Sequence, residues 1–152
     1  MKAKSLLIAS LASVFGIVMI TACGGGGQKG TTESAQVEET VDPAAQLARG
    51  EQIYKEKCFA CHQADGQGLP NVFPSLTGSD FLLNNTRMAV AQVLNGSEKV
   101  SSGGTVSYPA PMPPQLDNHE DAVAVINYVL KNFGNDGKLI TVDEVKDITV
   151  ER

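Results

Sequence analysis

The sequence of 152 residues predicts an all-α domain, built from three to four short helices that long loops connect. Apolar residues recur at helical spacing in three segments, near residues 43–57, 85–94 and 117–133. The stretches between them are rich in glycine and proline, which interrupt helices and favour turns. Three short helices bury little apolar surface for a domain of this size. The fold therefore needs a further source of apolar surface.

The first helix is predicted from Pro43 to about Lys57. Asp42 precedes it as an N-cap, and proline is favoured at the first helical position. One apolar stripe along this helix is formed by Leu47, Gly50, Ile53 and Tyr54.

The second helix is predicted from about Asn85 to Leu94, with Asn84 before it and Gly96 after it. Its candidate buried face consists of Met88, Val90, Ala91 and Leu94.

The third helix is predicted to begin at Asp117, which has the spacing of a capping box with Glu120, and Gly134 is expected to end it. Its apolar side is formed by Val125, Ile126, Val129, Leu130 and Phe133.

The most specific motif is Cys58-Phe59-Ala60-Cys61-His62. This spacing is what covalent attachment of a c-type haem requires. Each thiol would form a thioether with one haem vinyl group, and the histidine would bring a ring nitrogen to the iron. The first helix delivers both cysteines to the haem. One covalently attached haem would supply the apolar surface that the helices lack, so we expect the chain without haem to fold poorly.

Two other interpretations of the motif stay open. A zinc half-site would need four ligands, yet Cys23 has another role and His119 stands alone. A thioredoxin-like dithiol belongs with a strand–helix unit, and the stretch rich in glycine and proline after His62 offers no strand.

Residues 1–22 have the pattern of a secretory signal peptide. Two lysines precede an apolar run over residues 6–20, which is too short to span a membrane as a helix. The run ends in Ile20-Thr21-Ala22-Cys23, which resembles the lipobox of bacterial lipoproteins. The resemblance implies cleavage before Cys23 and its acylation, hence an exported protein anchored in the cell envelope, with its domain facing the periplasm. An ordinary signal peptide is the alternative, but it would leave an unpaired thiol.

A flexible linker is predicted after Cys23. Residues 24–41 are mostly Gly, Gln, Thr, Ser and Glu, with too little apolar surface to fold. Residues 23–41 would therefore tether one domain, residues 42–152, to the membrane.

Acidic residues outnumber basic ones in the processed chain. Loss of Lys2 and Lys4 leaves ten basic residues against seventeen acidic ones, a net charge of about −7. This balance argues against nucleic-acid binding and favours a partner with a positive docking patch.

Residues 44–133 resemble a class I monohaem cytochrome c. Gly50 and Tyr54 stand ahead of the haem-attachment motif as in the family's amino-terminal helix, where a glycine lets the carboxy-terminal helix cross closely. Tyr128 and Val125 resemble the other side of that contact.

Two loops complete the resemblance. Pro74, twelve residues after His62, is similar to the family's proline loop, which implies that its carbonyl accepts a hydrogen bond from the His62 ring. Met112, in a proline-rich segment, resembles the axial methionine, which implies His62/Met112 ligation of the iron. His119 is the rival ligand and is expected to be solvated, whereas Met88 is expected to pack in the core.

The resemblance implies a single-electron carrier rather than an enzyme, because both axial positions would be filled. Such a carrier would shuttle electrons through brief docking between a membrane oxidoreductase and a terminal oxidase, or a reductase such as nitrite reductase. The alternative is a small haem enzyme, or a gas or peroxide sensor, in which Met112 leaves the iron. Residues 97–108 are expected to form a small hairpin or a surface loop, and residues from about 134 a C-terminal extension with a short helix near Val142.

Overall fold

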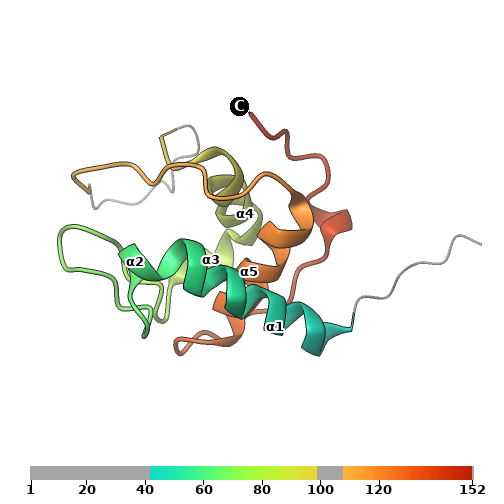
Figure 1. The fold of residues 1–152 in the computed structure, drawn as a ribbon, viewed down its shortest axis with the longest axis horizontal. Helices are drawn as coiled ribbons and strands as arrows, with labels where there is room; N and C mark the ends of the chain where they lie inside the picture. Colours follow the sequence, from blue (N-terminus) through green and yellow to red (C-terminus); the bar gives the residue numbers. More distant parts are fainter. Residues whose placement is uncertain (1–41, 99–107, 152) are drawn as a thin grey trace, which may run out of the picture. The chain divides into compact units, whose positions relative to one another are not determined.

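Helices and loops make up the part of the chain that the computed structural model describes, residues 42–98 and 108–151 (Figure 1). In chain order the elements are α1 (Pro43–Ile53), η1 (Tyr54–Cys58), α2 (Phe59–His62), α3 (Asp80–Asn84), α4 (Thr86–Asn95), α5 (His119–Lys131) and η2 (Val142–Glu144). Within these ranges strand-like pairing is limited to one bridge, between Leu69 and Phe73. The all-α class is confirmed. No helix in the described ranges is both long and apolar enough to cross a membrane. Most of the segment predicted as a hairpin or loop, residues 99–107, lies outside the description, as do residues 1–41.

The first helix is longer than the sequence predicts, because α1, η1 and α2 follow one another without a break. The carboxylate of Asp42 accepts a hydrogen bond from the amide of Ala44, so the predicted N-cap is present. Beyond Ile53 the backbone widens into a π-helical turn, in which the Phe59 amide donates to the Tyr54 carbonyl. Such turns rotate the residues that follow about the helix axis. The run ends only at His62.

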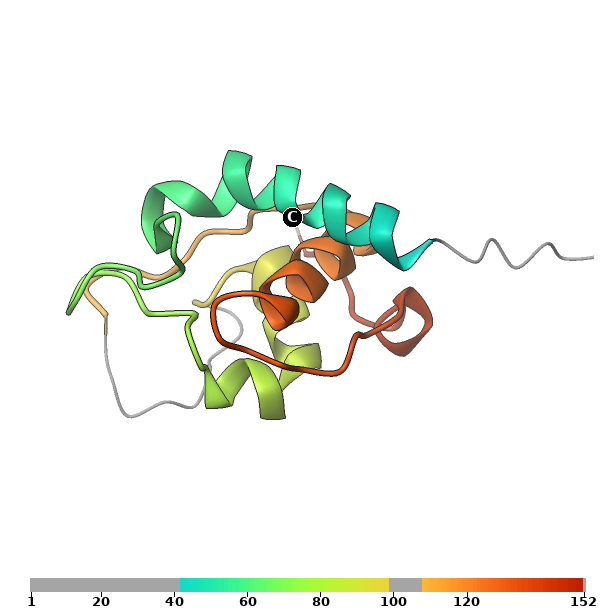
Figure 2. The same cartoon turned by 90° about the horizontal axis from the view of Figure 1, so that it is seen from below.

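Helix α1 crosses α5 at Gly50, as the family resemblance implies. A Cβ at this position would lie 2.1 Å from the carbonyl oxygen of Ala124 and 2.8 Å from the Cβ of Tyr128. Only glycine permits so close an approach of two backbones. The atoms nearest to that position belong to Ala124 and Tyr128, and the Val125 side chain is fully buried in the core. Figure 2 shows α1 lying across α5.

Helix α4 lies where the second helix was predicted, and a short helix that was not predicted, α3, precedes it. Ser79 caps α3, since its hydroxyl accepts a hydrogen bond from the amide of Leu82. Gly96, with φ of 84°, ends α4 as predicted. Within α4, Val90 and Leu94 are buried as expected, but Met88 is exposed, so its predicted core role is wrong.

Helix α5 (His119–Lys131) begins two residues later than predicted, and its cap differs. The Asn118 side chain accepts a hydrogen bond of 2.8 Å from the amide of Asp121. The capping box predicted for Asp117 and Glu120 is therefore wrong. Asn118 caps the helix instead of Asp117 because it lies directly before the first helical residue. From that position a side-chain oxygen reaches the amide three residues further along the chain. Among the described residues, α5 contributes more buried hydrophobic side chains than any other element: Ala122, Val123, Ala124, Val125, Ile126, Val129 and Leu130.

The C-terminal extension packs back onto the helices. We call residues 137–151 the C-terminal strap. Ile140 and Val145 of the strap join the buried core. The buried amide of Asn127 in α5 donates to the Ile140 carbonyl and accepts from the Ile140 amide. The short helix expected near Val142 is the single 3₁₀ turn η2.

Candidate haem-attachment site

The two cysteines of the motif lie where the π-helical turn passes into α2. Cys58 ends η1, and Cys61 stands three residues further along the same helical run. Residues three apart on a helix are neighbours on one face. Both thiols are free and half-buried. This arrangement offers two sulfur atoms to a single group on that face.

The thiol of Cys58 is not poised for redox chemistry. Burial, with a smaller contribution from Cys61, raises the pKa of Cys58 to about 11. Redox-active dithiols instead have a cysteine whose pKa is lowered, because the thiolate is the nucleophile. The pair also sits inside a helix rather than after a strand. Both observations argue against a thioredoxin-like dithiol.

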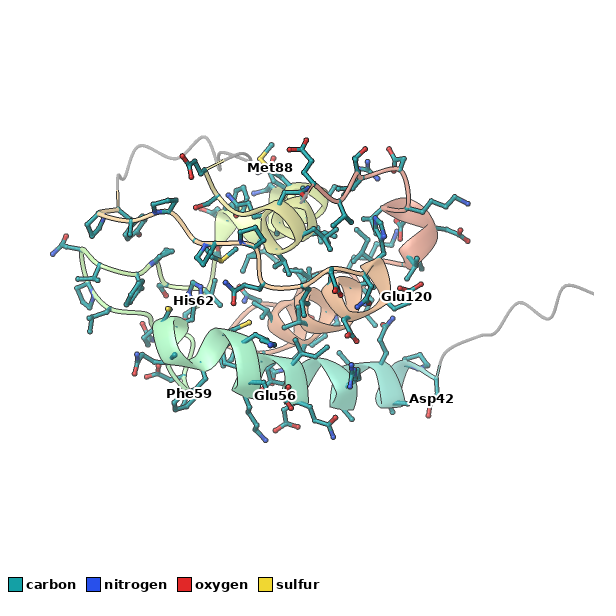
Figure 3. The ribbon with its side chains drawn as sticks, turned by 45° about the horizontal axis from the view of Figure 1, so that its top comes forward. Asp42, Glu56, Phe59, His62, Met88 and Glu120 are labelled. Carbon is teal, nitrogen blue, oxygen red and sulfur yellow. The ribbon has the colours of Figure 1, made fainter. Side chains whose placement is uncertain are left out.

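The imidazole of His62 is buried and held in one orientation (Figure 3). Its Nδ1 lies 3.0 Å from the carbonyl oxygen of Pro74. Because a carbonyl only accepts hydrogen bonds, Nδ1 carries the proton and Nε2 keeps its lone pair. Burial lowers the pKa of His62, against a smaller opposing effect of the Pro74 carbonyl. A neutral ring with a free Nε2 is what a metal ligand requires.

Tyr54 fixes the direction in which the chain leaves His62. The next residue, Gln63, has a φ of 65°, which is uncommon for any residue but glycine. The Tyr54 hydroxyl donates a hydrogen bond of 2.7 Å to the Gln63 carbonyl and so holds this turn. Burial raises the pKa of Tyr54, so its hydroxyl keeps the proton that it donates. The Tyr54 ring also packs against Tyr128 and Phe133, with ring centres 5.6 Å and 5.0 Å away.

Asn135 anchors the loop that carries Pro74, a role that the sequence did not reveal. Its buried amide donates to the carbonyls of Leu76 and Val129 and accepts from the amide of Ser79. The loop is thereby tied to the end of α5 on one side and to the start of α3 on the other. A buried asparagine has no periodicity that would mark it, although its place directly after Gly134 is a signal of backbone capping.

Met112 lies half-buried against the core in the proline-rich segment before α5. Both backbone polar groups of Met112 are hydrogen-bonded to Ser97. The Met112 amide donates to the Ser97 hydroxyl, and the Met112 carbonyl accepts from the Ser97 amide. In Figures 1 and 2, segment 108–118 and the loop after α2 extend beyond the same end of the helices.

The other candidate ligands point to different roles. His119 is half-buried rather than fully solvated as expected, and its Nε2 lies 2.9 Å from the carbonyl oxygen of Ile148 in the strap. Met88 lies on an exposed surface of α4, well apart from His62 in Figure 3. Among the residues described, no three Cys, His, Asp or Glu side chains gather into a cluster that would hold a metal ion. The zinc interpretation of the motif gains no support.

These residues fit a covalently held haem. Two thiols share a helix face, a neutral imidazole presents a free nitrogen, and a thioether lies at the rim of the core. Cys58, Leu76 and Met112 pack against the core while remaining partly exposed. The two thiols and the imidazole are therefore the groups that covalent attachment of a c-type haem requires.

Comparison with known proteins gives the same answer. The family model for cytochrome c matches residues 47–132. The chain is 30% identical to the fructose dehydrogenase cytochrome subunit of Gluconobacter japonicus over 104 residues, which are 65% of this chain and 21% of that protein. It is 33% identical over 93 residues to subunit CcoP of the cbb3-type cytochrome c oxidase of Rubrivivax gelatinosus, covering 61% of this chain and 28% of the relative. Identity to the cytochrome c subunit of a quinone alcohol dehydrogenase from Gluconobacter oxydans is 27%, over 68% of this chain and 22% of the relative.

The chain thus spans less than a third of the length of each of these relatives. The family match, in contrast, covers more than half of the chain and includes all of α5, α1 from residue 47 onward, the attachment motif, the proline loop and the Met112 segment. On this evidence the chain belongs to the cytochrome c family and binds haem c covalently at the Cys58-x-x-Cys61-His62 motif.

Proposed function

We propose that this electron-transfer cytochrome is a carrier of single electrons whose iron is held by His62 and Met112. When bound, haem c supplies a reversible one-electron iron couple. The observation that carries the proposal is the His62 ring, whose Nδ1 donates to the Pro74 carbonyl and leaves Nε2 for the metal. A fixed tautomer makes that nitrogen a better donor. Met112 is the proposed second ligand, since its segment is anchored and its thioether lies at the rim of the core.

A thioether as the second iron ligand should raise the reduction potential of the haem. Methionine stabilises ferric iron less than a second imidazole would, so His/Met ligation raises the potential. Hydrogen bonds hold the backbone or ring of both proposed ligands, which favours rapid electron transfer because little must rearrange when the iron gains or loses an electron. With both axial positions filled, the chain would act as a carrier and not as a catalyst.

We further propose that residues 1–22 are removed and that acylated Cys23 anchors the protein in the cell envelope. Residues 23–41 would form the linker, with the cytochrome domain, residues 42–152, facing the periplasm. The lipobox-like sequence before Cys23 supports this proposal. The relatives are cytochrome subunits of dehydrogenases and of an oxidase, which supports a membrane oxidoreductase as donor and a terminal oxidase or reductase as acceptor.

The ligand proposal is tested by carbon monoxide binding to the reduced, haem-loaded protein. We expect the wild type to leave carbon monoxide unbound and Met112→Ala to bind it, with a changed absorption spectrum. Met88→Ala is the matched control and should behave as the wild type. Ready binding by the wild type would contradict a closed iron and would favour the enzyme or sensor alternative.

The anchoring proposal is tested by fractionation of cells that produce the wild type or Cys23→Ser. We expect the wild type in the membrane fraction and the variant outside it, because one acylated residue carries the attachment. Membrane association of Cys23→Ser equal to that of the wild type would contradict the proposal.

A further inference from the structure

The segment that carries Met112 is seated on the C-terminal end of α4. Ser97 forms the direct contact, because its hydroxyl accepts from the Met112 amide at 2.7 Å and its amide donates to the Met112 carbonyl at 2.9 Å. Two opposed hydrogen bonds fix both the position and the orientation of the Met112 backbone. Further along, the Val93 carbonyl of α4 accepts from the amide of Gln115 at 2.9 Å. The Met112 segment is therefore held on both sides by the same turn.

Gly96 allows the Met112 segment to lie close against the C-terminal end of α4. A Cβ at residue 96 would lie 2.9 Å from the Met112 carbonyl oxygen and 3.0 Å from the Cδ of Pro114. The φ of 84° at Gly96 also turns the chain so that Ser97 faces the segment.

The same turn of α4 also holds the last residues of the C-terminal strap. Asn95 is buried, and its side-chain amide donates to the Thr149 carbonyl at 2.8 Å. Its side-chain oxygen accepts from the Glu151 amide at 2.7 Å. Asn95 thus pairs with the strap as Ser97 pairs with the Met112 segment, and only Gly96 separates the two residues.

From this arrangement we infer that Ser97 and Asn95 are positioning residues for Met112, and that the C-terminal strap strengthens Met112 ligation through them. Ser97 places the Met112 backbone directly. Asn95 ties the strap to the C-terminal end of α4 and so keeps that helix end from fraying, as helix ends otherwise do. The inference rests on the proposed ligation of the iron by Met112.

Competition by free imidazole measures how firmly Met112 holds ferric iron. A ligand that binds only the form with Met112 displaced gains apparent affinity in proportion to the population of that form. Loss of a hydrogen bond that holds the segment should raise this population about fivefold. We expect Ser97→Ala to raise the apparent affinity for imidazole by about that factor. Ser97→Thr keeps the hydroxyl and should restore the wild-type value.

A shortened chain tests the strap. Removal of residues 149–152 takes away both partners of Asn95 and leaves Asn95 itself in place. We expect it to raise imidazole affinity about as much as Ser97→Ala. Ser79→Ala is the matched control for serine, because its hydroxyl caps α3 and does not touch the Met112 segment. Lys146→Ala is the control on the strap, since its amine pairs with Asp143 within the strap.

Three variants separate the outcomes. Met112→Ala should raise imidazole affinity further than Ser97→Ala. If it does, but Ser97→Ala and the shortened chain match the wild type, the positioning role is overturned while Met112 remains the ligand. If Met112→Ala itself binds imidazole as the wild type does, Met112 is not the ligand, and the inference falls together with the proposed function.

Discussion

Buried amide side chains orient the backbone around the haem-attachment site. Asn135 satisfies three backbone groups, and Asn127, which is fully buried, bridges Gln46 of α1 and Ile140 of the strap. An amide can donate and accept at once, so one side chain joins segments that are far apart in sequence. These residues hold loops that have no helix of their own.

Replacement of Asn135 by alanine should therefore be costly. Asn135→Ala leaves the Leu76 carbonyl and the Ser79 amide without their partner, and we expect the free energy of unfolding to fall by about 3 kcal/mol. Denaturant unfolding of the haem-loaded protein measures this. Asn132→Ala is the control, because that amide donates only to the Tyr128 carbonyl of its own helix. Equal losses in the two variants would show that Asn135 does not anchor the Pro74 loop.

At this scale the sequence predicted residues with strong chemical signatures and missed those whose role depends on packing. The hydrogen bond between His62 and Pro74 follows from the family resemblance and is present. Ser97 and Asn135 carry no pattern, since a single polar residue in a loop is ordinary. Met88 and His119 were misjudged because which face of α4 is buried, and where the strap runs, are decided by tertiary contacts.

The crossing of α1 and α5 is the contact between elements on which the fold depends most visibly. Gly50→Ala would push a methyl group against the backbone of Ala124, which cannot move aside as a flexible side chain would. We expect the free energy of unfolding to fall by about 3 kcal/mol. Gln52→Ala, on an exposed part of α1, serves as the control in the same denaturant unfolding experiment. Wild-type stability of Gly50→Ala would mean that the helices separate without cost.

An ion pair near the crossing of α1 and α5 should make the stability of the domain depend on pH. Arg49 donates two hydrogen bonds to Asp121 and lowers the pKa of that carboxyl below its usual value of 3.8. A lowered pKa in the folded state adds stability above about pH 4, which is lost as the pH falls through the lowered value. We expect Asp121→Asn to lower Tm slightly at pH 7 and by less at pH 3, where part of the charge-dependent stabilisation is already lost. Asp136→Asn, at an exposed pair with Lys131, is the control. An equal drop in Tm at both pH values would contradict the role of the Asp121 charge.

Periodicity predicted the three longer helices, and Gly96 correctly marked the end of α4, but the end of the first helix was not predicted. The first continues to His62 because a π-helical turn keeps the backbone hydrogen-bonded past Lys57. Helix α3 was missed because five residues are too few for a periodic signal, although Ser79 before Asp80 is a capping signature.

At the scale of the whole domain, haem is expected to be part of the core. We predict that chain produced without haem attachment loses most of its far-ultraviolet helical signal and its cooperative unfolding, whereas the haem-loaded chain keeps both. Circular dichroism at rising temperature compares the two. A haem-free chain with native helicity and cooperative unfolding would show that α1, α4 and α5 suffice.

The unbroken helical run from Pro43 to His62 also places the start of the described domain and the haem-attachment motif at opposite ends of one rod. Its 20 residues have an axial length of about 30 Å, with Asp42 and His62 at opposite ends in Figure 3. The rod is packed against α5 at Gly50, so a force applied to the chain at Asp42 acts at the end opposite the haem-attachment motif. If the protein is anchored through Cys23 as proposed, a stiff spacer of this length would keep the haem-attachment motif about 30 Å farther from the anchor than Asp42 is, at the height of partners that project from the same membrane.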